Sequence, residues 1–336
     1  MLRPVLLILG FVICLLSLHA QDPIFSQFYS APLQINPAFT GNTYAPHISL
    51  NYRNQWPGWA DGSSAYVTYA AYYDQFSEEL NSGFGLSILS DDAGGGLIST
   101  NKLSGYFSYR LQVVEDFYLK FGVEASAIQA RFGWDKFIFL DQINERFGTV
   151  SPGGTPYPTE ETRPDDLNST YFDVSAGLLV YNELFYAGFS LKHLNTPNES
   201  LLNINDNINT GLPMRIALHG GMELKIREGN NRRAASFVSP NIMYLKQGDF
   251  GQLNLGALAN LDLIFGGIWY RHAFTNPDAV ILVLGVHKGV MKIGYSYDIS
   301  VGKLSGQSNG SHEVSLTLNF DKGKRIDYND CFQLLR

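Results

Sequence analysis

Alternation of apolar and polar side chains along most of the chain is the feature that most constrains its fold. The segment 290–300, VMKIGYSYDIS, shows the pattern: apolar side chains fall at 291, 293, 295 and 297, and polar or small ones fall between them. Successive side chains of a strand point to opposite faces, so this segment has one apolar and one polar face. Such a pattern, repeated many times with aromatic residues near strand ends, is typical of a transmembrane barrel with lipid outside and polar groups inside.

We expect about fourteen antiparallel strands that close into one transmembrane β-barrel. The expected strands are 43–53, 62–75, 82–91, 98–112, 116–132, 170–181, 183–194, 213–227, 234–247, 250–262, 263–273, 278–287, 289–299 and 311–321. Tight turns between them alternate with connections that include three long loops, at 133–169, 195–212 and 301–310. Outer-membrane barrels have short periplasmic turns, long external loops and an even number of strands. In 263–273 the alternation is weak, and it does not show which way Arg271 points.

Composition supports a membrane barrel over a soluble enzyme. Of the 336 residues, 16% are charged and 13% are aromatic, and the net charge is −7. No basic stripe exists that could neutralise phosphates, so nucleic acid is not an expected partner. After residue 20, no apolar run approaches the roughly 18–20 residues that a membrane-spanning helix needs. An exported chain of this kind would therefore meet the membrane as a barrel.

Residues 1–20 are predicted to be a secretory signal peptide. Arg3 provides the positive start, an apolar run follows, and Ala20 is the small residue before the expected cleavage site. Cys14 lies in this leader, so the mature chain would carry only Cys331 and could form no internal disulfide.

We expect residues 21–42 to form an N-terminal periplasmic plug segment, 43–321 the outer-membrane barrel and 322–336 a C-terminal periplasmic tail. Prolines at 23, 32 and 37 exclude a long helix or a central strand from the first segment. That segment nevertheless has six large apolar side chains that need burial: Phe25, Phe28, Tyr29, Leu33, Ile35 and Phe39. The mouth or lumen of the barrel is the best place for them, since a disordered leader would carry few such residues.

Motifs spread over nearly the whole mature chain point to a known family. They are QDP at 21–23, FSQFY at 25–29, NPA at 36–38 closing on Gly41, YRNQW at 52–56, GLLVY at 177–181, FYAGFSLKHL at 185–194, QLNLGA at 252–257, GGIWYR at 266–271, KIGYSYD at 292–298 and GSHEVSL at 310–316. With these motifs the chain resembles the PorP/SprF family of type IX secretion system outer-membrane proteins of Bacteroidetes. Its end differs, because the family commonly has Cys-Pro there and this chain has Cys331 followed by Phe332.

The resemblance implies a non-enzymatic barrel of the secretion and gliding machinery in the cell outer membrane. Its expected partners are the C-terminal domain of a secreted adhesin or another type B substrate, periplasmic ring or peptidoglycan-binding subunits, and outer-membrane lipid. The positions that carry the family motif or contact the plug would be Asn36, Pro37, Ala38, Gly41, Tyr52 and Arg53. The alternative function is an outer-membrane channel for a small or hydrophobic solute that enters past the plug.

Charged residues on the polar faces are the other candidate sites. The candidate lumen charges are Lys192, Arg215, Glu223, Lys225, Lys292 and Asp298. Because they have both signs, we expect a lumen of paired charges and plug contacts, with a permeation path for a charged solute and a catalytic set as alternatives. The carboxylates and histidines have no spacing that defines a metal site, and no catalytic triad or cofactor motif stands out.

A basic rim is expected at the periplasmic end. The candidate partner surface there consists of Arg227, Arg232, Arg233, Lys324 and Arg325. Such a surface could dock an acidic periplasmic partner. The alternative is a set of solvated turns that only keep the chain soluble.

Overall fold

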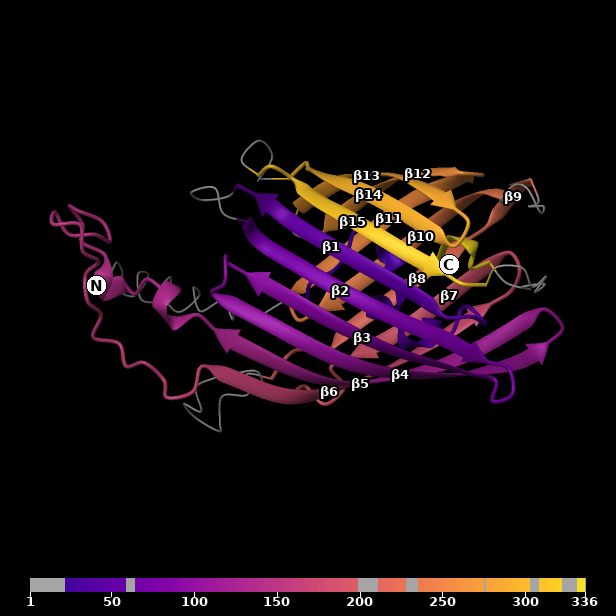
Figure 1. Cartoon of the computed structure of the whole chain (residues 1–336), viewed down its shortest axis with the longest axis horizontal. Coiled ribbons are helices and arrows are strands. Elements are labelled where there is room, and N and C mark those ends of the chain that lie inside the picture. Colours follow the sequence, from indigo (N-terminus) through magenta and orange to yellow (C-terminus); the bar gives the residue numbers. More distant parts are fainter. Residues whose placement is uncertain are drawn as a thin grey trace, which may run out of the picture.

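The structure is a computed structural model that describes residues 22–58, 64–198, 211–227, 235–274, 276–302, 308–321 and 331–335. In these ranges the chain is an antiparallel β-barrel (Figure 1). The predicted signal peptide, residues 1–20, lies outside the described residues. No helix among the described residues has the length and apolarity needed to cross a bilayer.

Fifteen strands make up the barrel in the described ranges. They are β1 (His47–Pro57), β2 (Ser64–Ser77), β3 (Ser82–Ala93), β4 (Ile98–Val114), β5 (Phe117–Phe132), β6 (Asn168–Tyr181), β7 (Phe185–Lys192), β8 (Arg215–Met222), β9 (Leu224–Arg227), β10 (Ser236–Gln247), β11 (Phe250–Leu261), β12 (Ile264–Ala273), β13 (Asn276–Lys288), β14 (Met291–Ser300) and β15 (Ser311–Asn319). Both β8 and β9 pair with β10, so they form one strand that is interrupted at Glu223. The remaining neighbours pair in chain order, and β1 pairs with β15 to close the ring. The expected fourteen-stranded, all-β barrel is therefore confirmed.

The two faces of each strand differ as the alternation predicts. On β3, Leu86 and Ile88 point outward and are 59% and 61% exposed, whereas Ser87 between them is buried. On β1 and β2, the rings of Tyr52 and Tyr69 pack against each other on the outer surface, with centroids 5.1 Å apart. Apolar side chains on the outside and polar ones inside are the arrangement that a bilayer requires of a barrel wall.

Strand β12 shows why its sequence alternates poorly. Phe265, Trp269 and Arg271 all point inward and are buried. The two aromatic rings pack on Phe28 and Tyr29 near the start of the chain, with centroids 5.9–6.4 Å apart. An inward face that packs against another part of the chain does not have to be polar, so the apolar–polar pattern is lost there.

The two ends of the barrel carry different connections. One, here called the long-loop end, has the β5–β6, β7–β8 and β14–β15 connections, and the first of these projects far from the barrel and contains η3 (Trp134–Lys136) and η4 (Leu140–Gln142) (Figure 1). The other, the short-turn end, has the tight turns β2–β3, β4–β5, β6–β7, β11–β12 and β13–β14. Strand β1 begins at the short-turn end, and strand β15 finishes there.

Candidate functional site

The N-terminal segment, defined as residues 22–42, lies inside the barrel. It forms three short helical turns, η1 (Phe28–Ser30), α2 (Pro32–Ile35) and η2 (Pro37–Phe39). Pro32 and Pro37 occupy the first positions of α2 and η2. Proline is compatible with the first position of a helix, where its missing N–H would have no intrahelical partner. The six large apolar side chains that were predicted to need burial are each at most 6% exposed. The segment therefore fills the lumen with apolar groups, although the barrel wall around it is largely polar.

Polar side chains of the wall bind the backbone of the N-terminal segment. Ser190 Oγ donates to the Ile35 carbonyl at 2.6 Å, and Ser108 Oγ and Lys120 Nζ both donate to the Thr40 carbonyl, at 2.7 and 2.8 Å. Backbone groups outside a regular ladder need such partners when they are buried. The polar inner face is thus complementary to this segment, not merely solvated.

Asn36 fixes the segment to β6 and β7. Its Oδ1 accepts from the Ala38 N–H at 2.8 Å and so caps η2, which begins at Pro37. Its Nδ2 donates to the carbonyls of Leu178 and Phe189, at 3.0 and 3.2 Å. One fully buried amide thereby joins the Asn-Pro-Ala motif to two strands of the wall.

Three inward-facing glycines give η2 the space it occupies. Gly122 on β5, Gly177 on β6 and Gly188 on β7, here called the glycine cradle, all face the motif. A Cβ at Gly177 would lie 1.9 Å from Asn36 Oδ1, and one at Gly122 would lie 2.2 Å from the Ala38 nitrogen. Sequence analysis did not single out these glycines, although glycine within a strand is a known sign of close backbone approach.

Gly41 lets the chain turn from the lumen into β1. Its φ is +70°, a conformation that favours glycine, and a Cβ there would lie 2.7 Å from the Gly83 Cα. The Gly41 N–H donates to Asp74 Oδ2 at 2.7 Å, and Asp74 Oδ1 lies 2.8 Å from His47 Nδ1. Asp74 therefore holds the turn at the short-turn end.

An arginine cluster surrounds Ser26 in the lumen. Arg53 pairs with Glu313 and lies 3.4 Å from Asp298, while Arg271 Nη2 lies 2.9 Å from Asp298 Oδ2. Both arginines also donate to Ser26 Oγ, at 2.7 and 2.9 Å. Arg271, whose direction the sequence did not show, is thus an inward-facing member of this cluster.

A second cluster contains two of the predicted lumen charges. Lys192 Nζ lies 2.7 Å and Lys102 Nζ 2.8 Å from the carboxylate of Glu124. Arg215 Nη1 lies 2.8 Å from Asp22 Oδ2, at the beginning of the N-terminal segment. Buried charges of opposite sign thus neutralise one another here, and Arg215 links the wall to the segment.

Three other predicted lumen charges lie toward the short-turn end. Glu223 Oε1 accepts from the Leu334 N–H at 3.0 Å, and Lys292 Nζ donates to the Leu334 carbonyl at 2.6 Å. Lys225, in contrast to the prediction, is exposed. It lies on β9, beyond the Phe185–Met222 pair at which the pairing of β7 with β8 ends.

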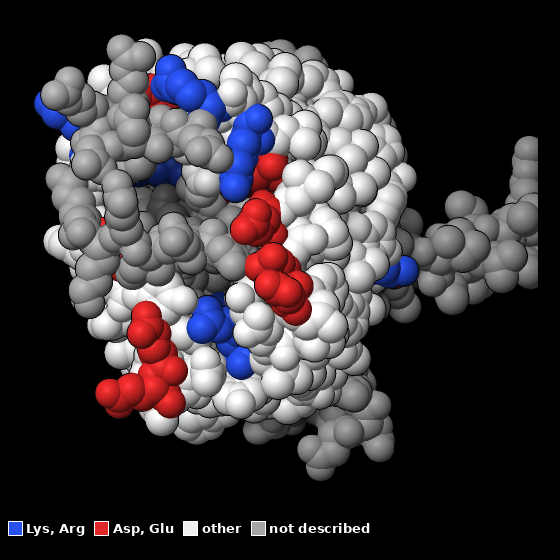
Figure 2. Space-filling view, turned by 90° about the vertical axis from the view of Figure 1, so that its right-hand side faces the viewer, with Lys and Arg blue, Asp and Glu red and all other residues white. Residues whose placement is uncertain are grey.

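Charges of both signs surround the short-turn end. Arg227 is exposed and donates to Ser236 Oγ at 3.1 Å. The other predicted rim residues, Arg232, Arg233, Lys324 and Arg325, lie outside the described residues. Acidic side chains are exposed in the turns of the same end: Glu78, Glu79, Glu115, Asp116 and Glu183. Figure 2, which views this end, shows both blue and red patches around the mouth, so its charge is mixed among the described residues.

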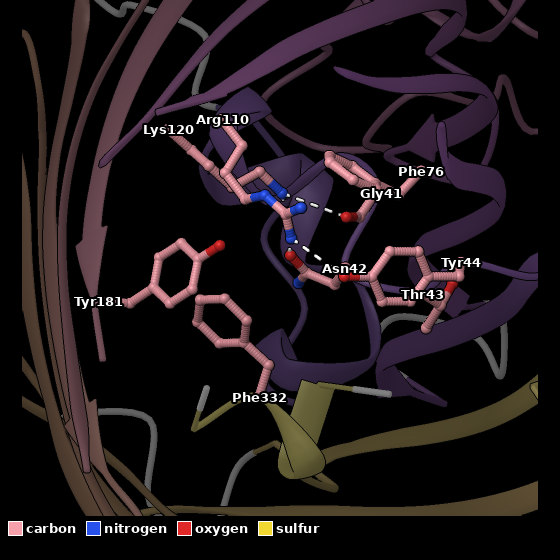
Figure 3. Close-up of a pocket in the computed structure, with 9 residues that line it drawn as sticks. All are labelled: Gly41, Asn42, Thr43, Tyr44, Phe76, Arg110, Lys120, Tyr181 and Phe332. Carbon is pink, nitrogen blue, oxygen red and sulfur yellow. Dashed lines mark hydrogen bonds between the residues drawn. The ribbon is translucent and has the colours of Figure 1, made fainter. Parts of the chain in front are cut away.

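A small pocket opens beside the N-terminal segment at the short-turn end. Arg110, Lys120, Tyr181 and Phe332 line it together with residues 41–44 and Phe76 (Figure 3). The Arg110 guanidinium lies 4.2 Å from the centre of the Phe76 ring. The cavity volume is about 10 Å³, the space of roughly one water molecule. In the parts of the chain that the structure describes, no group of three or more His, Cys, Asp or Glu side chains could hold a metal ion.

The comparisons with known proteins add a family and several similar folds. The family model "Type IX secretion system membrane protein PorP/SprF" matches residues 17–318. Among solved structures, "CymD monoaromatic hydrocarbon channel" is 14% identical, with a TM-score of 0.45, and the match covers 89% of this chain and 94% of that one. A "TodX deltaS2S3 mutant monoaromatic hydrocarbon channel" is 11% identical, with a TM-score of 0.45, coverage of 86% of this chain and 94% of that one. No curated protein matches the sequence.

Proposed function

The chain belongs to the PorP/SprF family of type IX secretion system membrane proteins, and on this basis we propose that it is a non-enzymatic component that supports export or surface attachment of secreted substrates. Its barrel resides in the outer membrane. The substrates would carry a type B C-terminal domain, as surface adhesins do, and the barrel would also anchor periplasmic ring or peptidoglycan-binding subunits. Family membership over most of the chain supports the secretion role.

The orientation that we propose places the short-turn end in the periplasm. Short turns face the periplasm in outer-membrane barrels, and long loops face the exterior. The N-terminal segment, after removal of residues 1–20, would then act as a plug, and partners would meet the barrel at its two ends. Exposed charges of both signs at the short-turn end favour a periplasmic partner whose surface also carries both signs.

The filled lumen is the observation that favours a secretion role over transport of solutes. Each inner cluster described above contacts the N-terminal segment, and the pocket beside it has room for about one water molecule. A barrel of this kind offers its partners a rigid body with two end surfaces. A solute would have to pass the N-terminal segment that occupies the lumen.

Deletion of the gene is expected to abolish surface display of one class of adhesin while leaving outer-membrane permeability unchanged. The reason is that the barrel supports a protein substrate and does not conduct solutes. Surface labelling of adhesins with antibodies, beside uptake of an outer-membrane-impermeant dye, measures both effects, and a plasmid copy of the gene is the control. Normal display of every adhesin in the deletion strain would contradict the proposal.

A solute channel is the second candidate, and the many polar groups on the inner wall are the observation in its favour. We expect the purified barrel in a planar bilayer to show no large steady conductance, because the N-terminal segment occupies the lumen. A large steady conductance of the intact chain would favour the channel instead.

A further inference from the structure

The last five described residues, Cys331–Leu335, lie at the short-turn end and are here called the C-terminal segment, and all of them except Gln333 are buried. Cys331, Phe332 and Leu334 are each 1% exposed and Leu335 is 3% exposed. The segment contains a single helical turn, η5 (Gln333–Leu335), and it pairs with no strand of the barrel. Its position is therefore held by side-chain contacts and by isolated hydrogen bonds.

Phe332 is the anchor of the C-terminal segment. Its ring lies among the rings of Tyr181 on β6, Tyr186 on β7 and Phe39 on η2, with centroids 4.7, 5.7 and 5.9 Å away. Figure 3 shows Phe332 reaching toward Tyr181 beside the pocket. Aromatic side chains in such an arrangement attract one another beyond the effect of their buried area. Three separate elements thus form one aromatic pocket around a single side chain.

The backbone of Leu334 is held from two sides. Glu223, at the interruption between β8 and β9, accepts from its N–H at 3.0 Å, and Lys292 on β14 donates to its carbonyl at 2.6 Å. Glu223 is 1% exposed, and hydrogen bonds to charged groups are stronger than neutral ones. An apolar pocket for a side chain combined with fixed partners for the neighbouring main chain is how proteins recognise short peptides.

We propose that Phe39, Tyr181, Tyr186, Glu223 and Lys292 form a peptide-binding socket at the short-turn end, and that the chain's own C-terminal segment is its exchangeable ligand. The ligand class is a short peptide that has an aromatic residue two positions before an apolar residue. The aromatic side chain enters the socket, and Glu223 and Lys292 bind the backbone N–H and carbonyl of the apolar residue. Glu223 faces inward and presents a buried carboxylate to the peptide. The proposal stands on these contacts and does not rest on the secretion role.

A truncated chain that ends at residue 330 tests the socket directly. The purified barrel should bind a fluorescent peptide of sequence SFQLLR, in which serine replaces Cys331, as measured by fluorescence anisotropy. The peptide SAQLLR should bind at least about tenfold more weakly, because it lacks the aromatic anchor. Full-length barrel should bind SFQLLR at least about tenfold more weakly than the truncated one, because its own segment occupies the socket at high effective concentration. Equal binding of the two peptides, or no binding to a folded truncated barrel, would overturn the proposal.

A second measurement applies to the full-length chain, in case the truncated one does not fold. After removal of residues 1–20, Cys331 is the chain's single cysteine, so the rate of its reaction with a maleimide reports release of the segment. Lys292→Met should raise that rate by about tenfold or more, because a hydrogen bond to a charged group is lost. Lys288→Met, at an exposed position on β13, should leave it unchanged. Rapid labelling of the unmodified barrel, or equal rates in both variants, would show that the segment is not held by the socket. Neither readout involves secretion, so failure here is distinct from failure of the proposed function.

Discussion

Gly122→Ala is expected to expel the N-terminal segment from the barrel. The new Cβ would lie 2.2 Å from the Ala38 nitrogen and 2.3 Å from the Pro37 carbonyl carbon, and these backbone atoms cannot move aside as a flexible side chain could. Overpacking of a filled core costs about 1–3 kcal/mol and sometimes more. With the hydrogen bonds of Asn36 displaced as well, we expect a loss of at least about 3 kcal/mol in the free energy of docking the segment.

Chymotrypsin provides the measurement, because the N-terminal segment contains Phe25, Phe28, Tyr29 and Phe39 but no lysine or arginine. In the unmodified barrel these sites are buried and should resist cleavage, whereas in Gly122→Ala they should be cut, as detected by mass spectrometry. Loss of the segment should also produce a conductance in planar bilayers. The matched control is Gly105→Ala on the neighbouring strand β4, where a Cβ would meet nothing within 4 Å. Equal protection of the two variants would show that the glycine cradle does not hold the segment.

Arg53→Met is expected to destabilise the whole barrel by about 3–5 kcal/mol, because it leaves a buried carboxylate without its cation. Glu313, which pairs with Arg53, is 1% exposed and also accepts from the N–H groups of Ser26 and Gln27, at 2.6 and 2.9 Å. The loss should appear as a lower urea concentration at the midpoint of unfolding in detergent. The folded fraction is measured from the difference in gel mobility between the folded and the heat-unfolded barrel.

The control for this prediction is Arg131→Met, which removes the same side chain from an exposed position of β5 and should change stability by less than about 0.5 kcal/mol. The double variant Arg53→Met, Glu313→Gln should recover part of the loss, since removing both charges leaves no buried ion unpaired. If Arg53→Met and Arg131→Met have equal effects, the arginine cluster does not stabilise the barrel.

The barrel could be predicted because each strand carries its own signal. Alternation of side chains is local, and it places Ser87 inward and Leu86 outward without reference to any other strand. The interruption at Glu223 could not be predicted in this way, because the alternation continues through that residue. In β12 the alternation fails, because Phe265 and Trp269 are apolar side chains on the inward face. They face inward because they pack on Phe28 and Tyr29, more than 200 residues away in the sequence.

The inner site could be predicted in kind but not in detail. The sequence shows that Arg53, Arg215 and Asp298 face the lumen, yet the partner of each side chain depends on how distant strands meet. The pairing of Arg215 with Asp22 joins residues nearly 200 positions apart, and nothing near either residue indicates it. Glycines on the inner face did carry a usable signal for where the N-terminal segment lies closest to the wall.

The pairing of β1 with β15 has a consequence for biogenesis. Arg53 and Glu313 are directly opposed across this seam, and the same glutamate holds Ser26 just ahead of the first strand. Residues near the two ends of the barrel sequence must therefore meet before the barrel closes, and contacts at such separation form late. A chain that stopped before β15 would lack the strand that pairs with β1, so its barrel would stay open. Closure of the barrel therefore requires that the chain be made through β15.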